Sequence, residues 1–375
     1  MENKKRVYII TRHAIANYGS ILQAYATQKI FENLGYETKI IDYIPEEEKT
    51  KNLCNTYIKN SKFWNKNFIT RLLYKVVQKK NVENMNKRFS TYRSELLKLT
   101  EQQYSNNDEL RKKLPLADIY CTGSDQVWGK IGTKEYDETY FLDFAPNGKK
   151  CISYAASFGK SKINDDVIKK LPTLLSKYDS LLVRENTAVN IIRKFGFKNV
   201  KEVLDPTLVL DKDSWEKMIE PVKESKKYIF VYQLHHNKFF NKYARYVSKE
   251  TGLGLIRVNP SIYFKFKPGK FRYKVNPGQF LDYIKNAEYV LTDSFHGTVF
   301  LILFNKKFVD ILPNVTSTRI TSLLDLLHLN DRIIYDKLDC EKLLKKIDYP
   351  EVNNILEKEK EKSLNQLIKS TKGTI

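Results

Sequence analysis

Short apolar runs alternate with segments of helical periodicity along most of this chain, and this alternation limits the possible folds more than any other feature. Val7–Thr11 and Thr38–Tyr43 have the composition of strands. Between them, Leu22, Ala26 and Ile30 recur every four residues, as on one face of a helix. A chain that begins as strand, loop, helix and strand is typical of a parallel sheet.

The same pattern returns twice further along the chain. The expected strands are Ala117–Cys121, Ile152–Ala156, Ser180–Val183, Val200–Leu204, Tyr228–Leu234, Leu253–Val258, Ala287–Leu291 and Phe308–Leu312. Helical segments separate most of these strands. We therefore predict an α/β protein with two parallel-sheet domains, for which 375 residues are sufficient.

The composition becomes loop-like after Pro206, and we place the domain boundary there. The first domain is expected at residues 1–210, with a basic helical insertion at about 49–100. The second domain is expected at residues 211–375 and ends in a charged helix.

Polar clusters follow several of the expected strands. They are His13–Ser20, Gly123–Trp128, Arg184–Asn186, Gln233–His236 and Asp293–Gly297. Ligands of open α/β sheets bind beyond the carboxyl ends of the strands. If the two domains face each other, these clusters line one cleft between them.

Thr292–Val299 joins an expected strand to an apolar helix through a polar turn. The first turn of a helix has backbone N–H groups without intrahelical partners and attracts anions. His296 would lie beside such an anion site as a titratable group. The alternative is a simple strand–turn–helix joint with a solvent-facing histidine.

Two further segments have both a functional and a structural interpretation. Asn17–Ser20 could bind phosphate at a helix N-terminus, or Asn17 or Ser20 could simply cap that helix. Arg184, at the end of a buried strand, needs a negative partner. That partner is either a bound carboxylate or phosphate, or a neighbouring acid such as Glu185 or Asp205.

The sequence carries few signs of metal binding or of secretion. The four cysteines are scattered, and we interpret them as reduced packing residues. The histidines lack the spacing of a metal site, so no metal is expected. Nothing resembles a signal peptide, and no apolar run approaches the roughly 20 residues of a membrane span. We expect a cytoplasmic protein.

The net charge of +21 is concentrated in one segment. Residues 49–98 contain 13 Lys and Arg but only Glu83 and Glu95 as acids. Trp64, Phe68 and Leu72 share a helical face there, with lysines between them. The segment is either a surface for anionic membranes at the inner face of the cell membrane, or a helical pair that packs its apolar stripe on the protein. Nucleic acid is not expected as a partner, because helix-turn-helix and zinc-finger signatures are absent.

Seven segments resemble the polysaccharide pyruvyl transferase family, in the order in which the family has them. They are Asn17–Ala26, Ile41–Tyr43, Thr122–Trp128, Ser153–Gly159, Val183–Glu185, Val203–Leu208 and Thr292–Phe300, with Gly-Ser-Asp-Gln-Val-Trp and Asp-Ser-Phe-His-Gly as the most specific strings. The resemblance extends over about residues 10–330 and does not include the lysine-rich segment.

This resemblance implies a GT-B-like architecture of two Rossmann-like domains facing across a cleft. It also implies transfer of pyruvate from phosphoenolpyruvate to a sugar of a cell-surface polysaccharide, or of its lipid- or nucleotide-linked precursor, as a ketal. His296 and Arg184 match family positions, and Arg319 occupies a basic position of the family. Phosphoenolpyruvate is a co-substrate, and no cofactor is implied.

The residues fit this chemistry in three groups. Ketal formation needs a general acid and then a base, for which His296 is the candidate, with Asp293 to orient it or to stabilise its imidazolium. Donor binding is predicted for Arg184, Arg319, Ser294, Gly297, Asn17 and Gly19. Acceptor binding is predicted for Asp125, Trp128 and His13, although Trp128 could equally be a core residue. A GT-B glycosyltransferase that uses a nucleotide sugar is the alternative.

Overall fold

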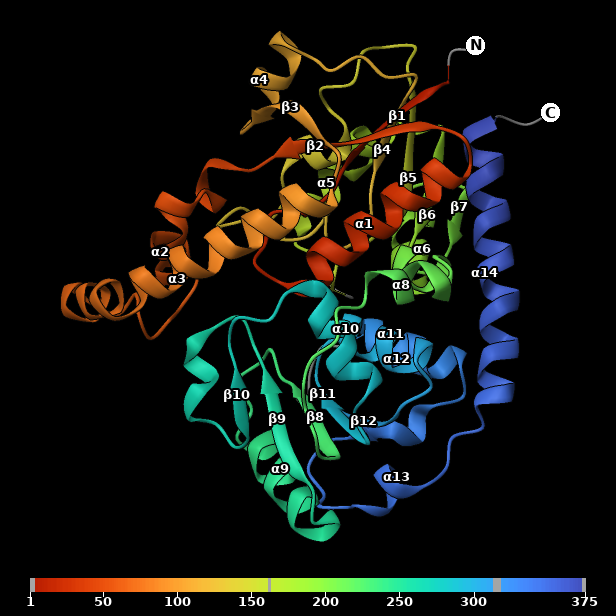
Figure 1. Cartoon of the computed structure of the whole chain (residues 1–375). Coiled ribbons are helices and arrows are strands. Elements are labelled where there is room, and N and C mark those ends of the chain that lie inside the picture. The colour runs from red at the N-terminus through yellow and green to blue at the C-terminus, as the bar shows by residue number, and fades with distance from the viewer. Residues whose placement is uncertain (1–3, 161–162, 313–317, 373–375) are drawn as a thin grey trace. The chain divides into compact units, whose positions relative to one another are not determined.

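The computed structural model describes residues 4–160, 163–312 and 318–372 (Figure 1). It divides into two compact units: unit 1 comprises Met1–Val209 and Glu359–Ile375, and unit 2 comprises Leu210–Lys358. The first division falls one residue before the boundary that we placed after residue 210. The last part of the chain, which we expected in the second domain, belongs to unit 1.

Unit 1 is built on a seven-stranded parallel sheet with the order β3-β2-β1-β4-β5-β6-β7. Its strands are β1 (Arg6–Ile10), β2 (Glu37–Tyr43), β3 (Leu99–Tyr104), β4 (Ile119–Thr122), β5 (Lys150–Ala156), β6 (Ser180–Val183) and β7 (Val200–Glu202). The central strands are almost wholly buried, as expected for a sheet that is covered on both faces.

The helices of unit 1 follow its strands in the expected alternation. They are α1 (Tyr18–Asn33), α2 (Thr50–Lys59), α3 (Phe68–Leu96), α4 (Asn107–Lys112), α5 (Asp165–Leu175), α6 (Asn186–Arg193), α7 (Pro206–Val209) and the end of α14 (Tyr349–Lys372). Helices α2 and α3 form the insertion between β2 and β3, and they extend away from the sheet of unit 1 (Figure 1).

Unit 2 contains a six-stranded parallel sheet with the order β10-β9-β8-β11-β12-β13. Its strands are β8 (Tyr228–Tyr232), β9 (Gly254–Val258), β10 (Lys270–Arg272), β11 (Tyr289–Thr292), β12 (Lys307–Ile311) and β13 (Ile333–Ile334). Its helices are α8 (Lys212–Met218), α9 (Lys238–Thr251), α10 (Pro277–Lys285), α11 (Phe295–Leu303), α12 (Thr318–Leu326), α13 (Glu341–Leu344) and the start of α14.

In both sheets the first strand lies in the middle, and the fourth strand is added on its other side, so that the strand order changes direction there. We call this position the strand reversal; all strands remain parallel. In unit 1 the reversal lies between β1 and β4, and in unit 2 it lies between β8 and β11. This is the strand order of a Rossmann fold, whose ligands bind outside the carboxyl ends of the strands at such a reversal. The loops after β1, β4, β8 and β11 are therefore the places where each unit can form a site.

The structure corrects one interpretation of the insertion. We considered that its apolar stripe packs on the protein, but Phe68, Leu72 and Val76 are exposed. The buried apolar residues of α3 are Val82, Met85 and Phe89 instead, in the second half of the helix. The first half of α3 thus presents apolar side chains to solvent.

Candidate functional site

The strand reversal of unit 2 brings Asp293 and His235 together. Asp293 follows β11, and its carboxylate accepts hydrogen bonds from the backbone N–H groups of Leu234 (2.6 Å) and His235 (2.9 Å) in the loop after β8. The Nδ1 atom of His235 lies 3.3 Å from the same carboxylate. This hydrogen bond raises the pKa of His235 above its usual value, while burial opposes the rise. His235 is thereby favoured as a cation at the carboxyl edge of the sheet.

Asp293 contacts a histidine that we did not assign to the site, His235. Its carboxylate holds the His235 loop and the His235 ring, and its predicted role at His296 stays a prediction. The carboxylate is buried, and the His235 side chain is 62% exposed, so the ring is accessible to a ligand. This pair could not be predicted from the sequence pattern, because 58 residues separate its two members.

The loop that carries His235 is held by further buried polar contacts. Arg257, on β9, donates to the side-chain carbonyl of Gln233 over 2.7 Å, and the side chain of Asn259 donates to the Gln233 backbone carbonyl over 2.7 Å. All three side chains are buried. These contacts fix the loop at the position from which Asp293 receives its hydrogen bonds.

Helix α11 begins directly after Asp293, with Ser294 as its N-cap. The Ser294 hydroxyl accepts a hydrogen bond from the backbone N–H of Gly297 over 3.2 Å. A Cβ atom at Gly297 would come within 2.6 Å of the Thr292 hydroxyl oxygen, so the helix approaches β11 too closely for a side chain there. The positive end of the α11 dipole consequently lies at the strand reversal, where it favours an anion.

Phe295, the first residue of α11, contacts both His296 and Arg319 near this helix terminus. The rings of Phe295 and His296 are 5.2 Å apart, and the Arg319 guanidinium lies 5.6 Å from the centre of the Phe295 ring. Arg319 also acts electrostatically on His235, whose pKa it lowers. His296 is largely buried. Unit 2 thus gathers His235, His296, Arg319 and the N-terminus of α11, all of which suit an anionic ligand.

A buried carboxyl group, which the sequence did not single out, lies behind the helix. Asp310 on β12 accepts a hydrogen bond from the Thr298 hydroxyl over 2.8 Å. Burial raises the pKa of Asp310 well above its usual value. The group therefore keeps its proton to a higher pH than an ordinary aspartate does.

In unit 1, Arg184 has carboxylate partners from the protein itself. One guanidinium nitrogen donates to Asp205 over 2.8 Å, and another lies 3.3 Å from Asp125. Asp205 also accepts from the Ser124 hydroxyl over 2.8 Å, and Glu185 lies 3.8 Å from Arg184. The salt bridge that we considered as an alternative is the observed arrangement. Three carboxylates surround this one cation, and donor binding by Arg184 stays a prediction.

The Gly123–Trp128 segment separates into a surface part and a core part. Asp125 has a positive φ of 75° and a partly exposed side chain, so it remains a candidate acceptor-binding residue. Trp128 is 1% exposed, and its ring stacks on Phe141 with centres 5.4 Å apart. The core alternative therefore applies to Trp128, whose ring is not available to stack on a sugar.

The loop after β1 uses its polar groups internally. The Asn17 side chain accepts a hydrogen bond from the Gly19 N–H over 2.8 Å and caps α1. His13 is buried, and burial together with the charge of Arg93 lowers its pKa to about 3. The capping alternative for Asn17 is thus observed, while donor binding by Asn17 and Gly19 and acceptor binding by His13 stay predictions. Arg93, from α3, reaches this buried region from outside the recognised motifs.

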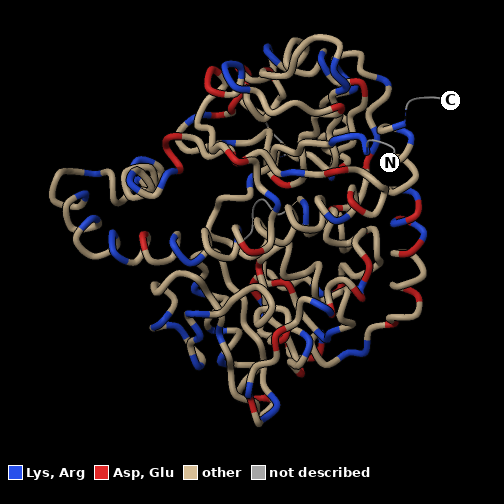
Figure 2. Tube along the Cα trace, turned by 45° about the horizontal axis from the view of Figure 1, so that its top comes forward, with Lys and Arg blue, Asp and Glu red and all other residues tan. Residues whose placement is uncertain are grey.

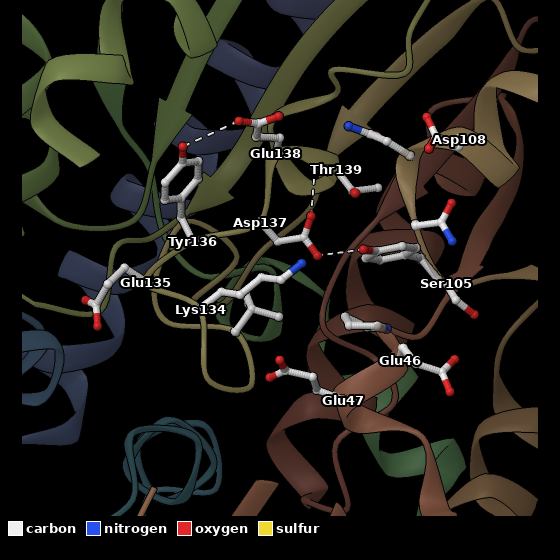
Figure 3. A pocket seen from close by; sticks show the side chains of 15 residues that line it. Glu46, Glu47, Ser105, Asp108, Lys134, Glu135, Tyr136, Asp137, Glu138 and Thr139 are labelled. Carbon is white, nitrogen blue, oxygen red and sulfur yellow. Dashed lines mark hydrogen bonds between the residues drawn. The ribbon is translucent and has the colours of Figure 1, made fainter. Parts of the chain in front are cut away.

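A cavity of about 770 Å³ lies in unit 1 beyond β2 and β3 (Figure 3). Its lining includes the carboxylates of Glu46, Glu47, Asp108, Glu135, Asp137 and Glu138, with Lys134. The Tyr43 hydroxyl donates a hydrogen bond to Asp137 over 2.6 Å. Burial raises the pKa of Tyr43, so this phenol keeps its proton. The excess of carboxylates would repel an anionic donor, and we do not place the donor there.

No group of three or more His, Cys, Asp or Glu in residues 4–160, 163–312 and 318–372 could hold a metal ion. In the same ranges, no helix has the length and hydropathy to cross a bilayer.

Comparisons with known proteins agree with the fold and identify the family. The family model for polysaccharide pyruvyl transferase matches residues 17–314. The S. aureus MnaA–UDP co-structure has 12% sequence identity and a TM-score of 0.51, and the alignment covers 97% of this chain and 90% of that one.

A crystal structure of UDP-N-acetylglucosamine 2-epimerase has 10% identity and a TM-score of 0.51, with 99% of this chain and 97% of that one covered. Comparison with curated proteins gives no match. These likenesses confirm the predicted GT-B type of fold, with two Rossmann-like units. Because the family model matches most of its length, the chain belongs to the polysaccharide pyruvyl transferase family and is a transferase.

Proposed function

We propose that this enzyme transfers the pyruvyl group of phosphoenolpyruvate to two hydroxyls of a sugar, in a cell-surface polysaccharide or its lipid- or nucleotide-linked precursor. The observation that carries the proposal is the group of cationic and dipolar elements at the strand reversal of unit 2. Phosphoenolpyruvate bears a carboxylate and a phosphate. His235, Arg319 and the N-terminus of α11 provide matching positive charge in one place.

The reaction requires two bonds to form at C2 of phosphoenolpyruvate. A proton is added to the methylene carbon, and a first sugar hydroxyl adds to C2 and loses its proton. A second hydroxyl then attacks C2, the C2–O bond to phosphate breaks, and inorganic phosphate leaves. One hydroxyl proton restores the acid, and the other leaves with phosphate.

We propose that His296, which lies in the specific Ser-Phe-His-Gly string, donates the proton that is added to the methylene carbon. His235 is a second candidate for the acid, since its hydrogen bond to Asp293 favours the imidazolium. We assign Arg319 and the Ser294–Gly297 turn to the phosphate and carboxylate of the donor. Asp125 remains our candidate for binding acceptor hydroxyls.

Ligand-induced thermal stabilisation tests the donor. A ligand that binds the folded state raises the unfolding temperature in proportion to the logarithm of its concentration above Kd. We expect phosphoenolpyruvate to stabilise the enzyme, and His235→Gln or Arg319→Gln to weaken this effect. Stabilisation by UDP-N-acetylglucosamine without any effect of phosphoenolpyruvate would favour a glycosyltransferase instead.

The acid is tested separately by His296→Gln. Its donor-induced stabilisation should persist, while the release of phosphate in the presence of acceptor should fall by about 10²-fold or more. Full activity in this variant, with loss of activity in His235→Gln, would transfer the acid role to His235.

A further inference from the structure

The first half of α3 and the turn before it expose an unusual number of large apolar side chains. They are Phe63, Phe68, Ile69, Leu72, Leu73, Val76 and Val77, each at least half exposed. Phe68, Ile69 and Val76 are 75%, 73% and 75% exposed. Contiguous exposed apolar surface of this kind marks an interaction site far more often than isolated apolar residues do.

Helix α3 does pack one side on the protein, so a lack of packing does not explain its exposed apolar residues. On α3, residues three and four apart share a face, so Ile69, Leu72, Leu73 and Val76 form one stripe. Tyr74 points elsewhere and packs on Trp64, with ring centres 5.3 Å apart.

Further along the helix, Val82 is buried in a small cluster with Leu53 and Cys54 of α2. Helix α3 therefore already packs one face on α2, and the apolar stripe lies on the face left over. The N-terminus of α3 is also well formed, because Asn67 and Thr70 make a reciprocal capping box.

Basic residues surround this stripe. Seven basic residues lie within positions 59–80: Lys59, Lys62, Lys66, Arg71, Lys75, Lys79 and Lys80. No acidic residue occurs between Glu48 and Glu83. Figure 2 shows Lys and Arg distributed over the α2–α3 pair where it extends from unit 1. Long basic side chains can direct their ammonium groups to a polar layer while their stems lie beside apolar surface.

An anionic bilayer surface matches both properties at once. A basic amphipathic helix buries its apolar face at the boundary of headgroups and acyl chains, while its cations meet lipid phosphates. A second copy of this chain fits poorly, because a twofold contact would bring two identical cationic surfaces together. Nucleic acid would pair with the lysines but would leave the apolar stripe in water.

We propose that residues 59–80, the α2–α3 tip, bind the surface of membranes that contain anionic lipids. This binding would hold the enzyme where a lipid-linked glycan is available. The inference does not depend on the proposed reaction, since vesicle binding needs neither donor nor acceptor.

Co-sedimentation of the full chain with vesicles tests the proposal. Vesicles of equal parts phosphatidylcholine and phosphatidylglycerol should bind the enzyme at least tenfold more tightly than phosphatidylcholine alone. The variant with Phe68→Ser, Leu72→Ser and Val76→Ser should lose this binding at least tenfold. The variant with Lys62→Gln, Lys66→Gln, Lys75→Gln and Lys79→Gln should do the same.

A matched control removes equal charge elsewhere. Lys238→Gln, Lys242→Gln, Arg245→Gln and Lys249→Gln change four basic, exposed residues of α9 in unit 2 and should leave binding within twofold. Circular dichroism checks that each variant is folded. The substituted side chains of the α2–α3 tip are all exposed, which favours folding.

Three results would overturn the proposal. One is an absence of binding to anionic vesicles by the folded, unaltered enzyme. Another is an equal loss of binding in the α9 control, which would make the effect one of total charge. The third is a pair of observations on the apolar variant: its vesicle binding is unchanged, and analytical ultracentrifugation shows a smaller assembly than that of the unaltered enzyme. This result would assign the stripe to a contact between copies.

Discussion

At the scale of single residues, the contact between His235 and Asp293 sets the charge of the candidate donor site. Asp293 is buried, yet its two oxygens accept two backbone N–H groups and face an imidazole. A buried carboxylate is stable only when it is satisfied in this way. The consequence is a histidine that favours its charged form at the strand reversal of unit 2.

Removing the charge of Asp293 should therefore lower the pKa of His235. In the unaltered protein, NMR titration should give His235 a pKa above its usual value of about 6.5. In Asp293→Asn, the pKa should fall towards or below that value, because the hydrogen bond to a charged acceptor is lost. His328, on the surface of the same unit, is the internal reference. An unchanged His235 pKa in the variant would show that Asp293 is not the cause of the rise.

The raised pKa of Asp310 predicts how the stability of the folded protein depends on pH. Its folded-state pKa is raised by burial, so above the ordinary carboxyl pKa of about 3.9 the folded state holds more protons than the unfolded state. Its contribution to stability consequently decreases as pH rises through that window. Asp310→Asn cannot titrate, so the variant should gain stability relative to the unaltered protein, by up to about 1.4 kcal/mol for each pH unit in the window.

Thermal unfolding of both proteins at about pH 4 and pH 8 measures this difference. Asp336→Asn, at an exposed position, is the control and should show little change between the two pH values. A difference between Asp310→Asn and the unaltered protein that stays constant with pH would contradict a raised pKa.

At the scale of elements, the close approach of α11 to β11 depends on a missing side chain. The Cβ atom of an alanine at Gly297 would lie 2.6 Å from the Thr292 hydroxyl oxygen and 3.2 Å from the Tyr232 ring. We expect Gly297→Ala to destabilise the protein by about 1–3 kcal/mol through overpacking. Gly254→Ala, at a position with open space, should change stability by less than about 0.5 kcal/mol.

Chemical denaturation with a linear extrapolation measures both variants. Equal effects at Gly297 and Gly254 would mean that the strand–helix contact tolerates a side chain. In that case, the position of the α11 N-terminus would not depend on this glycine.

Elements with a strong apolar pattern could be predicted from the sequence. β6 has the predicted bounds, and most other predicted strands end within a few residues of the expected positions. β3, β10 and β13 were missed. The polar run Glu101–Gln103 hides β3, which lies at a sheet edge and is only partly buried. β10 is a three-residue edge strand within a loop rich in Lys and Phe.

The place of the polar loops at strand ends could be predicted from the sequence, but their contacts could not. The polar loops do follow strand ends, as alternation of strands and helices requires. The partner of Asp293 and the carboxylates around Arg184 depend on loops that are distant in sequence. Sequence spacing within one segment has no information about such long-range pairs, and it therefore could not distinguish a ligand-binding arginine from an ion-paired one.

At the scale of the whole chain, the last helix belongs to two units. The start of α14 lies in unit 2, while Glu359–Ile375 belongs to unit 1. There the Ser363 hydroxyl accepts the backbone N–H of Leu204 over 2.9 Å, and Ser370 contacts Ser180 over 2.7 Å. The C-terminal segment thus completes unit 1 and is not a separate appendage.

Ser363→Ala tests that role. It leaves the buried Leu204 N–H without its acceptor, and we expect a loss of about 1–3 kcal/mol in the free energy of unfolding. Ser90→Ala, at an exposed position of α3, should cost less than about 0.5 kcal/mol. Denaturant unfolding compares the two. A loss of similar size in both variants would contradict a specific contribution of the Ser363 contact.

We propose that the whole enzyme moves a pyruvyl group from phosphoenolpyruvate to a sugar. The direct measurement uses phosphoenolpyruvate with carbon label in the pyruvyl group and phosphorus label in the phosphate. The acceptors are lipid-linked and nucleotide-linked sugars extracted from cells that make the enzyme. We predict equal amounts of released phosphate and of carbon label in a saccharide, and one deuterium in the new methyl group when the solvent is D₂O. Consumption of a nucleotide sugar by the enzyme in this assay, without transfer of carbon label to a saccharide, would contradict pyruvyl transfer.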